Sequence, residues 1–254
     1  MIKIDDRLEL RVNDDNVSSN IFGYQNSSNL LVLVPGTLYD TEKPPEHCIL
    51  RSVQEKLADK SLSLMVNRTR RFGNDLYEIT PSEYAKRIET ALDIVVSSYH
   101  TIDSISYVSH STGALTLGHL FDKNSKSKNL LLTPPSPTKS VVEQVKRCTY
   151  DLMPVSIEAS NPSQIAYRSR EGFDCYFGDE IWDDINTLEP AYMNLCKQDS
   201  HTGIIFATKD RVFPFSDEDI KLFHNAIKVE DTHSLKNPES LKIISDYIIT
   251  EMLI

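Results

Sequence analysis

The sequence predicts an α/β fold in which a mostly parallel, twisted sheet of about eight strands is flanked by helices. Short apolar runs rich in valine, isoleucine and leucine alternate with amphipathic stretches along the chain. This alternation is typical of buried parallel strands with helices on both faces of the sheet. The chain has 254 residues, 40% of them hydrophobic, which is enough to enclose one large core.

Eight apolar runs mark the expected strands. The first two, residues 3–12 and 20–24, form an opening pair, with the Asn-Asp-Asp-Asn stretch at 13–16 as their turn. The others follow at intervals that leave room for a helix or a short connection. They cover residues 29–34, 62–66, 104–108, 129–133, 203–208 and 226–230.

Helical patterns fall between these strands, near residues 47–59, 81–99, 111–122, 216–225 and 237–253. The last pattern repeats apolar residues every three or four positions, at Leu241, Ile244, Tyr247, Ile248 and Met252. The second pattern has a complete start signal. Thr80 stands at the cap position, Pro81 in the first turn and Glu83 three residues after the cap.

Residues 134–200 interrupt the alternation because they contain no clear strand. The segment starts with a proline cluster and is too long for a connecting loop in a compact domain. We therefore expect a helical cap or lid at 134–200, inserted into a core formed by 1–133 and 201–254. The insertion holds the only tryptophan of the chain, Trp182, and several other aromatic residues.

Composition excludes several classes of partner. The formal net charge of −10 disfavours nucleic acid and anionic membrane surfaces, which require a basic footprint. No run of 18 apolar residues predicts a membrane span, and the N-terminal residues lack a secretory pattern, so a cytoplasmic location is expected. The four cysteines form no Cys-x-x-Cys pair, which argues against a zinc site or a disulfide framework. Composition leaves the oligomeric state undetermined.

Ser111 follows the expected strand at 104–108 and precedes a helix, with Gly113 two places later and Ser109 two places earlier. Two interpretations are open. Serine is a common helix cap. Alternatively, the stretch is a nucleophile elbow, in which a sharp turn between strand and helix needs small residues on either side of an exposed nucleophile. The strand, turn and helix setting favours the elbow.

A serine nucleophile needs an imidazole base that a carboxylate orients. Asp210 lies just past the expected strand at 203–208, and His233 lies just past the next one, at 226–230. Their order along the chain is Ser, Asp, His, as the mechanism requires on this architecture. The other six histidines do not follow a late strand, so Ser111, Asp210 and His233 are the expected catalytic residues.

With these residues the chain resembles the α/β-hydrolase superfamily. The similarity covers nearly the whole length, through "LVLVPGT", "SHSTGA", "ATKDRVFP" and "DTHS". In that superfamily the strand before the first helix usually ends in His-Gly; here Pro35 replaces the histidine and Gly36 is kept. The resemblance implies an oxyanion hole formed by the backbone amides of Thr37 and Thr112. Ser109 also departs from the pattern, because glycine is usual there.

The expected reaction is acyl transfer to water through an acyl-enzyme on Ser111, with no metal and no organic cofactor. The expected substrate is then a small-molecule carboxylic ester or acyl thioester, either free or bound to a carrier. Leu38 and Tyr39, beside the hole, and Trp182, in the cap, are candidate substrate contacts in an apolar pocket. Their alternative role is ordinary core packing.

Three further points stay open from the residues alone. Arg68, Arg70 and Arg71 follow the strand at 62–66 and so lie at the same sheet edge as Ser111. They could meet an anionic group, although a surface ion-pair role is favoured. An acyltransferase would use the same three catalytic residues. A ligand-binding protein of the same fold would hold a ligand without turnover.

Overall fold

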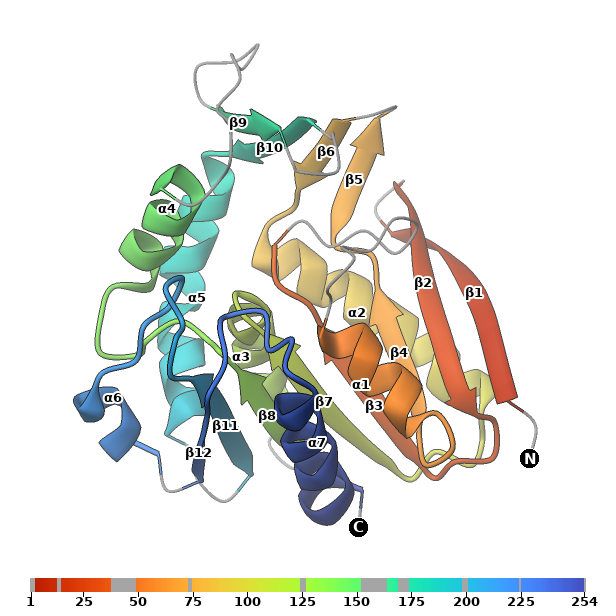
Figure 1. Ribbon diagram of the computed structural model, residues 1–254. Coiled ribbons are helices and arrows are strands. Elements are labelled where there is room, and N and C mark those ends of the chain that lie inside the picture. Colours follow the sequence, from red (N-terminus) through yellow and green to blue (C-terminus); the bar gives the residue numbers. More distant parts are fainter. Residues whose placement is uncertain are drawn as a thin grey trace.

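The computed structural model describes residues 3–12, 15–37, 49–72, 75–123, 127–151, 164–168, 174–197, 201–223 and 225–253 (Figure 1). Its largest element is an eight-stranded sheet with the order β1-β2-β4-β3-β7-β8-β11-β12. The pairs β1–β2 and β2–β4 are antiparallel, and the remaining five pairs are parallel. The expected mostly parallel sheet of about eight strands is therefore confirmed.

Seven of these strands lie within two residues of the predicted positions; β2 begins five residues earlier than predicted and takes in part of the expected turn at 13–16. Their bounds are β1 Lys3–Val12, β2 Asp15–Tyr24, β3 Asn29–Val34, β4 Leu62–Val66, β7 Ser104–His110, β8 Lys128–Leu132, β11 Thr202–Ala207 and β12 Ala226–Val229. The central strands are buried on both faces, which explains their unbroken apolar sequences.

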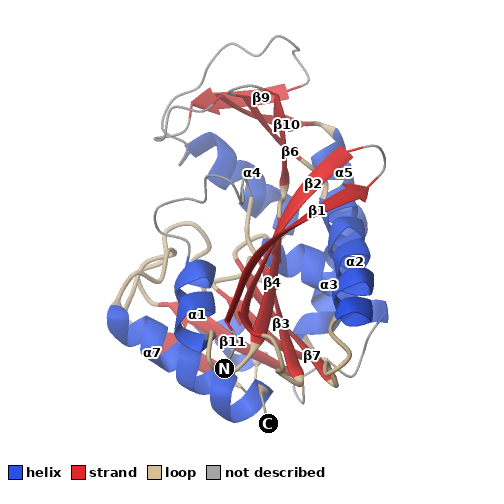
Figure 2. Ribbon diagram, turned by 90° about the vertical axis from the view of Figure 1, so that its right-hand side faces the viewer, coloured by secondary structure: helices blue, strands red, loops and turns tan. Residues whose placement is uncertain are grey.

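Helices cover both faces of the sheet (Figure 2). On one face, α1 (Ile49–Leu57) and α7 (Pro238–Tyr247, continued by a π-helical turn at Ile248–Met252) pack with the alternate side chains of the central strands. On the other face, α2 (Pro81–Ser98), α3 (Gly113–Lys123) and α5 (Glu180–Cys196) build the larger core cluster. Two more helices are α4 (Val141–Asp151), which adds four buried side chains to the larger cluster, and the short α6 (Asp217–Lys221).

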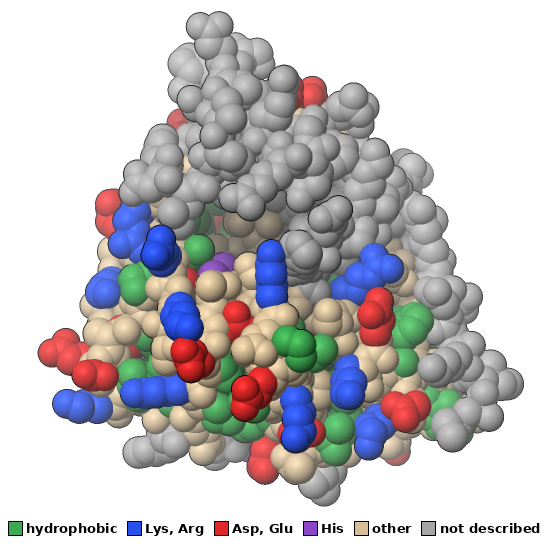
Figure 3. All heavy atoms as spheres, in the orientation of Figure 1, with side chains coloured by type: hydrophobic (Ala, Val, Ile, Leu, Met, Phe, Trp, Pro, Cys, Tyr) green, Lys and Arg blue, Asp and Glu red, His purple; other side chains and the backbone are tan. Residues whose placement is uncertain are grey.

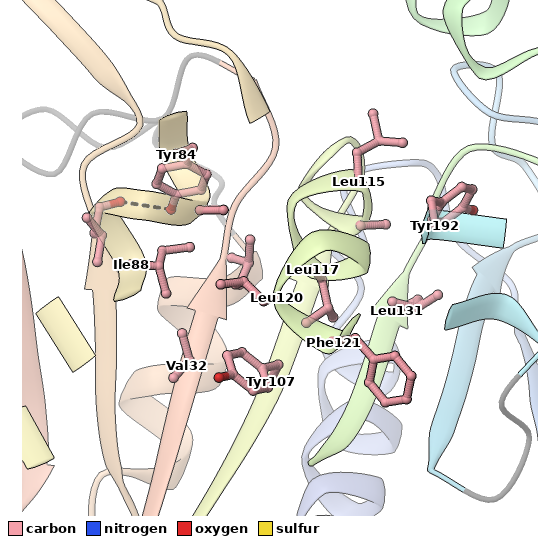
Figure 4. Close-up of a cluster of buried hydrophobic side chains, with 14 of the residues drawn as sticks. Val32, Tyr84, Ile88, Tyr107, Leu115, Leu117, Leu120, Phe121, Leu131 and Tyr192 are labelled. Carbon is pink, nitrogen blue, oxygen red and sulfur yellow. Dashed lines mark hydrogen bonds between the residues drawn. The ribbon is translucent and has the colours of Figure 1, made fainter. Parts of the chain in front are cut away.

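The larger cluster positions α2 and α3 against the sheet (Figure 4). Val32 and Tyr107 from adjacent strands face Ile88 of α2 and Leu120 of α3, all of them buried. The hydroxyl of Tyr84 donates to the backbone oxygen of Val66 at 2.9 Å, so this buried polar group is satisfied.

The predicted start of α2 is confirmed. Thr80 has extended backbone angles and accepts a hydrogen bond from the Glu83 amide at 3.2 Å, and Pro81 is the first helical residue. The N-terminus of this helix was therefore determined by local sequence.

The expectation that residues 134–200 contain no strand is wrong. A second, four-stranded sheet has the order β5-β6-β10-β9, formed by β5 Thr69–Phe72, β6 Asp75–Glu78, β9 Gln164–Arg168 and β10 Asp174–Gly178. Each of these strands has only four or five residues, and none is an unbroken apolar run. The pairs β5–β6 and β9–β10 are local, whereas β6 pairs with β10 across about a hundred positions of sequence. Their pairing depends on tertiary structure, which local apolar runs do not reveal.

Helix α5, although it lies within 134–200, packs closely on α3. A Cβ atom added at Gly118 of α3 would stand 2.8 Å from the backbone of Tyr192, so glycine is needed at this helix crossing. We keep 134–200 as the proposed insertion, but side chains of its α4, β10 and α5 all belong to the main core cluster. No helix in the described ranges is long and apolar enough to span a membrane.

Candidate active site

Ser111 lies between the end of β7 and the start of α3, with a φ of +58°. A positive φ is unfavourable for any residue with a side chain, and such strain gathers at functional sites. The Ser111 amide donates to the backbone oxygen of Leu132 at 2.9 Å, which ties the turn to the neighbouring strand β8. The turn thus has the strained geometry expected of a nucleophile elbow.

Two glycines allow this turn to pack against the end of β3. A Cβ atom at Gly113 would stand 2.2 Å from the backbone oxygen of Val34, a severe clash. A Cβ atom at Gly36 would stand 3.0 Å from the Ser111 Cβ atom. Gly113 therefore requires a residue without a side chain, and a side chain at Gly36 would be tight against Ser111.

Ser111, His233 and Asp210 form a continuous hydrogen-bonded line. The hydroxyl of Ser111 lies 2.9 Å from His233 Nε2, and His233 Nδ1 lies 2.8 Å from Asp210 Oδ2. A carboxylate only accepts hydrogen bonds, so Nδ1 carries the proton of the neutral ring and Nε2 is left to accept from the serine hydroxyl. The fold thus brings together the three residues selected by their order along the chain, and the donors and acceptors are oriented so that His233 can accept the Ser111 proton.

Asp210 is held by its own loop. Its second oxygen, Oδ1, accepts hydrogen bonds from the amides of Val212 at 2.7 Å and Phe213 at 3.0 Å. The ring of Phe213 stands edge-on to the imidazole of His233, with the centroids 5.4 Å apart. One oxygen of the carboxylate therefore fixes the loop while the other faces the histidine.

The loop that carries His233 is fixed by a second buried carboxylate. Asp231 accepts from the amide of Thr232 at 2.7 Å, the amide of Asn237 at 2.8 Å and the hydroxyl of Ser240 at 2.8 Å. These bonds join the end of β12 to the start of α7. The backbone around His233 is thereby closed into a compact turn.

His110 also supports His233, a role that sequence reasoning missed. Its Nε2–H donates to the backbone oxygen of His233 at 2.9 Å, and Thr133 Oγ1 donates to the same oxygen at 3.3 Å. Burial, and next to it the neighbouring imidazole of His233, lower the pKa of His110 from 6.5 to about 4. A neutral His110 does not repel the positive charge that His233 would gain. The only sequence signal was its position next to Ser111.

Of the two expected oxyanion-hole amides, one is free and one is not. The Thr112 amide has no hydrogen-bond partner among the described residues. The Thr37 amide, in contrast, donates to the side-chain oxygen of Thr112 at 3.0 Å. The structure therefore brings Thr37 and Thr112 together, but the Thr112 hydroxyl accepts the hydrogen bond of the Thr37 amide, which the sequence did not predict.

Solved structures of known proteins can be compared with this geometry. Est1E from Butyrivibrio proteoclasticus superposes with a TM-score of 0.64 at 16% identity, over 95% of each chain. An esterase from Pyrococcus furiosus gives 0.62 at 9% identity, over 98% of this chain and 92% of that one. A thioesterase domain from the curacin biosynthetic pathway gives 0.56 at 15% identity, over 98% of this chain and all of that one. The chain has the α/β-hydrolase fold. No protein-family model and no curated sequence matches it significantly.

In this α/β-hydrolase fold, Arg68 supports the loop that carries Thr37. Its Nη1 donates to the backbone oxygen of Pro35 at 3.1 Å, and its Nε lies 2.5 Å from Glu78 Oε1. The two side chains are 1% and 0% exposed. The expectation of a surface ion pair is therefore wrong for Arg68, because both partners of its ion pair are buried. It is right for Arg70, which pairs with Glu83 at 2.8 Å; the Arg71 side chain lies outside the description.

Arg68→Met is expected to lower the free energy of unfolding by about 3–5 kcal/mol, because it leaves the Glu78 carboxylate buried without its cation. Arg70→Met removes a partly exposed cation two residues further on, in β5, and should cost about 1 kcal/mol or less. Urea unfolding followed by circular dichroism measures both. Equal losses for the two variants would contradict a structural role for the buried pair.

The candidate substrate contacts are only partly placed. Leu38 and Tyr39 lie outside the described residues. Trp182 lies in α5, 7% exposed, and stacks on Phe177 with the ring centroids 6.3 Å apart. Its indole belongs to the main core cluster, and its contact with substrate stays a prediction. Figure 3 shows a face hollowed beside a histidine side chain, with Lys and Arg side chains nearby.

No group of three or more His, Cys, Asp or Glu side chains converges to hold a metal ion within the described part of the chain. The polar groups that do converge are a hydroxyl, an imidazole, a carboxylate and a backbone amide without a partner among the described residues.

Proposed function

We propose that the protein is a serine hydrolase that cleaves a carboxylic ester or an acyl thioester through an acyl-enzyme on Ser111. The observation that carries the proposal is the hydrogen-bonded line from Ser111 Oγ through the ring of His233 to Asp210, at 2.9 and 2.8 Å, starting from a strained residue at a strand-to-helix turn. This combination is the working geometry of a serine nucleophile.

Acylation starts when the Ser111 oxygen attacks the substrate carbonyl carbon and His233 Nε2 takes the hydroxyl proton. Asp210 stabilises the imidazolium through Nδ1–H. The carbonyl oxygen becomes an oxyanion next to the Thr112 amide, which has no other partner among the described residues. When the carbon–oxygen or carbon–sulfur bond of the substrate breaks, His233 returns the proton to the leaving alcohol or thiol.

Deacylation repeats these steps with water. His233 Nε2 removes a proton from a water molecule that attacks the acyl carbon, and a second oxyanion forms at the same position. Its collapse breaks the bond to Ser111 Oγ, and the serine oxygen recovers its proton from His233. The products are a carboxylic acid and the regenerated enzyme, and one water molecule is consumed for each substrate cleaved.

Similarity of fold supports both leaving groups. Among the similar structures are two esterases and a thioesterase domain. A further structure is Est1E with ferulic acid bound. The substrate proposed here is a small acyl ester or thioester, including one bound to a carrier. The cap proposed at 134–200 would then cover the acyl group.

A labelling and turnover experiment tests the proposal. We expect a fluorophosphonate probe to label the protein at Ser111, and the protein to hydrolyse p-nitrophenyl esters or acyl thioesters from a series of graded chain length. An added alcohol acceptor separates hydrolysis from transfer, because a hydrolase releases mostly the free acid. A folded protein that is neither labelled nor turns over any member of the series would overturn the proposal.

A further inference from the structure

The side-chain hydroxyl of Thr112 binds one of the two backbone amides that were expected to form the oxyanion hole. It accepts the hydrogen bond of the Thr37 amide, at 3.0 Å. The Thr37 amide is thus engaged within the protein rather than open to a substrate. What the Thr112 hydroxyl does with its own proton then decides how the oxyanion is held.

The hydrogen bonds of this hydroxyl are incomplete. A hydroxyl has one proton to donate and two lone pairs to accept with. One lone pair of Thr112 Oγ1 accepts the hydrogen bond from the Thr37 amide. The hydroxyl's own proton has no acceptor among the described residues. The residue is only 4% exposed. Because buried hydroxyls are normally paired, this proton is available to a group that enters the site.

The backbone amide of Thr112 is unpaired in the same way, and it precedes α3 directly. The positive end of the helix dipole favours negative charge there. Thr112 therefore offers two donors, one from the backbone and one from the side chain, on the residue that follows the nucleophile. An oxyanion formed on a carbon bonded to Ser111 develops beside them.

We propose that Thr112 Oγ1–H donates a hydrogen bond to the oxyanion, and that the Thr37 amide acts through this hydroxyl. A hydroxyl that accepts an N–H bond is polarised and becomes a stronger donor. The proton stays on Oγ1 throughout, so the step adds no charge and moves no atom. This inference rests on the proposed function, since it assigns a catalytic residue to that reaction.

The opposite arrangement makes a different prediction. If Thr112 Oγ1 merely occupied the position of the substrate oxygen, a substrate would have to displace it, and the Thr37 amide would then bind the oxyanion directly. Removing the hydroxyl would free that amide, and turnover would stay the same or rise.

The test compares Thr112→Val with Thr112→Ser. Valine keeps the shape and the backbone amide but removes the hydroxyl, so we expect kcat to fall about 100-fold, the usual effect of losing one oxyanion donor, with KM changed little. Serine keeps the hydroxyl and should stay within a few-fold of wild type. Thr116→Val, which removes another buried hydroxyl from the next turn of α3, is the matched control with unchanged kcat.

Inhibitor binding provides a second readout. A trifluoromethyl ketone that adds to Ser111 forms a stable oxyanion, so its inhibition constant should rise with Thr112→Val about as much as kcat falls, while the carboxylic acid product binds as before. If valine prevents folding, Thr112→Ala against Thr112→Ser gives the same comparison.

The outcomes separate this inference from the proposed function. If the wild-type protein turns over substrate and Thr112→Val has the same or a higher kcat, the role of the hydroxyl is overturned and the hydrolase proposal stands. A wild-type protein without labelling or turnover overturns both. A fall in kcat together with an equal fall for Thr116→Val would also overturn the role of the hydroxyl, since the loss would then be structural.

Discussion

Ser111→Ala is expected to lower kcat for any ester or thioester that the protein hydrolyses by a factor on the order of 10⁶. Alanine keeps the backbone turn but removes the oxygen that lies 2.9 Å from His233 Nε2, so no acyl-enzyme can form. Steady-state hydrolysis measures the rate, and intact-protein mass spectrometry after fluorophosphonate treatment measures the label. Both should be lost together.

Ser109→Ala is the matched control for this variant. Ser109 lies in β7 two residues before the nucleophile, fully buried, and its hydroxyl has no partner among the described residues. Removing an unpaired buried hydroxyl should leave kcat unchanged and leave stability equal or slightly higher. Retention of one tenth or more of the wild-type kcat by Ser111→Ala would show that another group is the nucleophile.

Asp210→Asn is expected to lower kcat by about 10⁴-fold, as the loss of this carboxylate does in other serine enzymes. The asparagine oxygen can still accept from the amides of Val212 and Phe213, so the loop is preserved. Its NH₂ group then faces His233 Nδ1 and donates to it. The ring proton moves to Nε2, which faces Ser111, and the ring can no longer accept the serine proton.

The same assay with Asp217→Asn is the control, because Asp217 lies on the exposed first turn of α6 and its loss should not change kcat. Thermal unfolding of both variants checks that the fold is intact. An Asp210→Asn protein within tenfold of wild type would mean that the tautomer of His233 is fixed by other groups, and the role assigned to Asp210 would be wrong.

Much of the fold and part of the site follow from the sequence because their signals are local. A buried strand such as β3 needs an unbroken apolar run, and the Thr80 cap needs only the residues of its own first turn. The candidates Ser111, Asp210 and His233 each follow such a strand. Parallel strands bring their carboxyl ends to one edge, so position along the chain was enough to select them.

Two features could not be predicted from local sequence and depend on tertiary structure: the small four-stranded sheet and the hydrogen bonds that hold the loops of the site. Strand β6 pairs with β10 across about a hundred residues, and Glu78 at the end of β6 forms the buried ion pair with Arg68, which binds the Pro35 carbonyl. The contacts of His110 with the His233 backbone and of Thr37 with the Thr112 hydroxyl likewise join segments 75 or more residues apart.

The sequence by itself determined where the strands of the large sheet and the helices between them form, because those preferences depend on neighbouring residues and on whether a face is buried. It also determined the order of the three candidate catalytic residues along the chain. Packing between distant segments decides which carbonyl the buried Arg68 binds and which hydroxyl accepts the hydrogen bond of the Thr37 amide. Only the folded chain fixes those contacts.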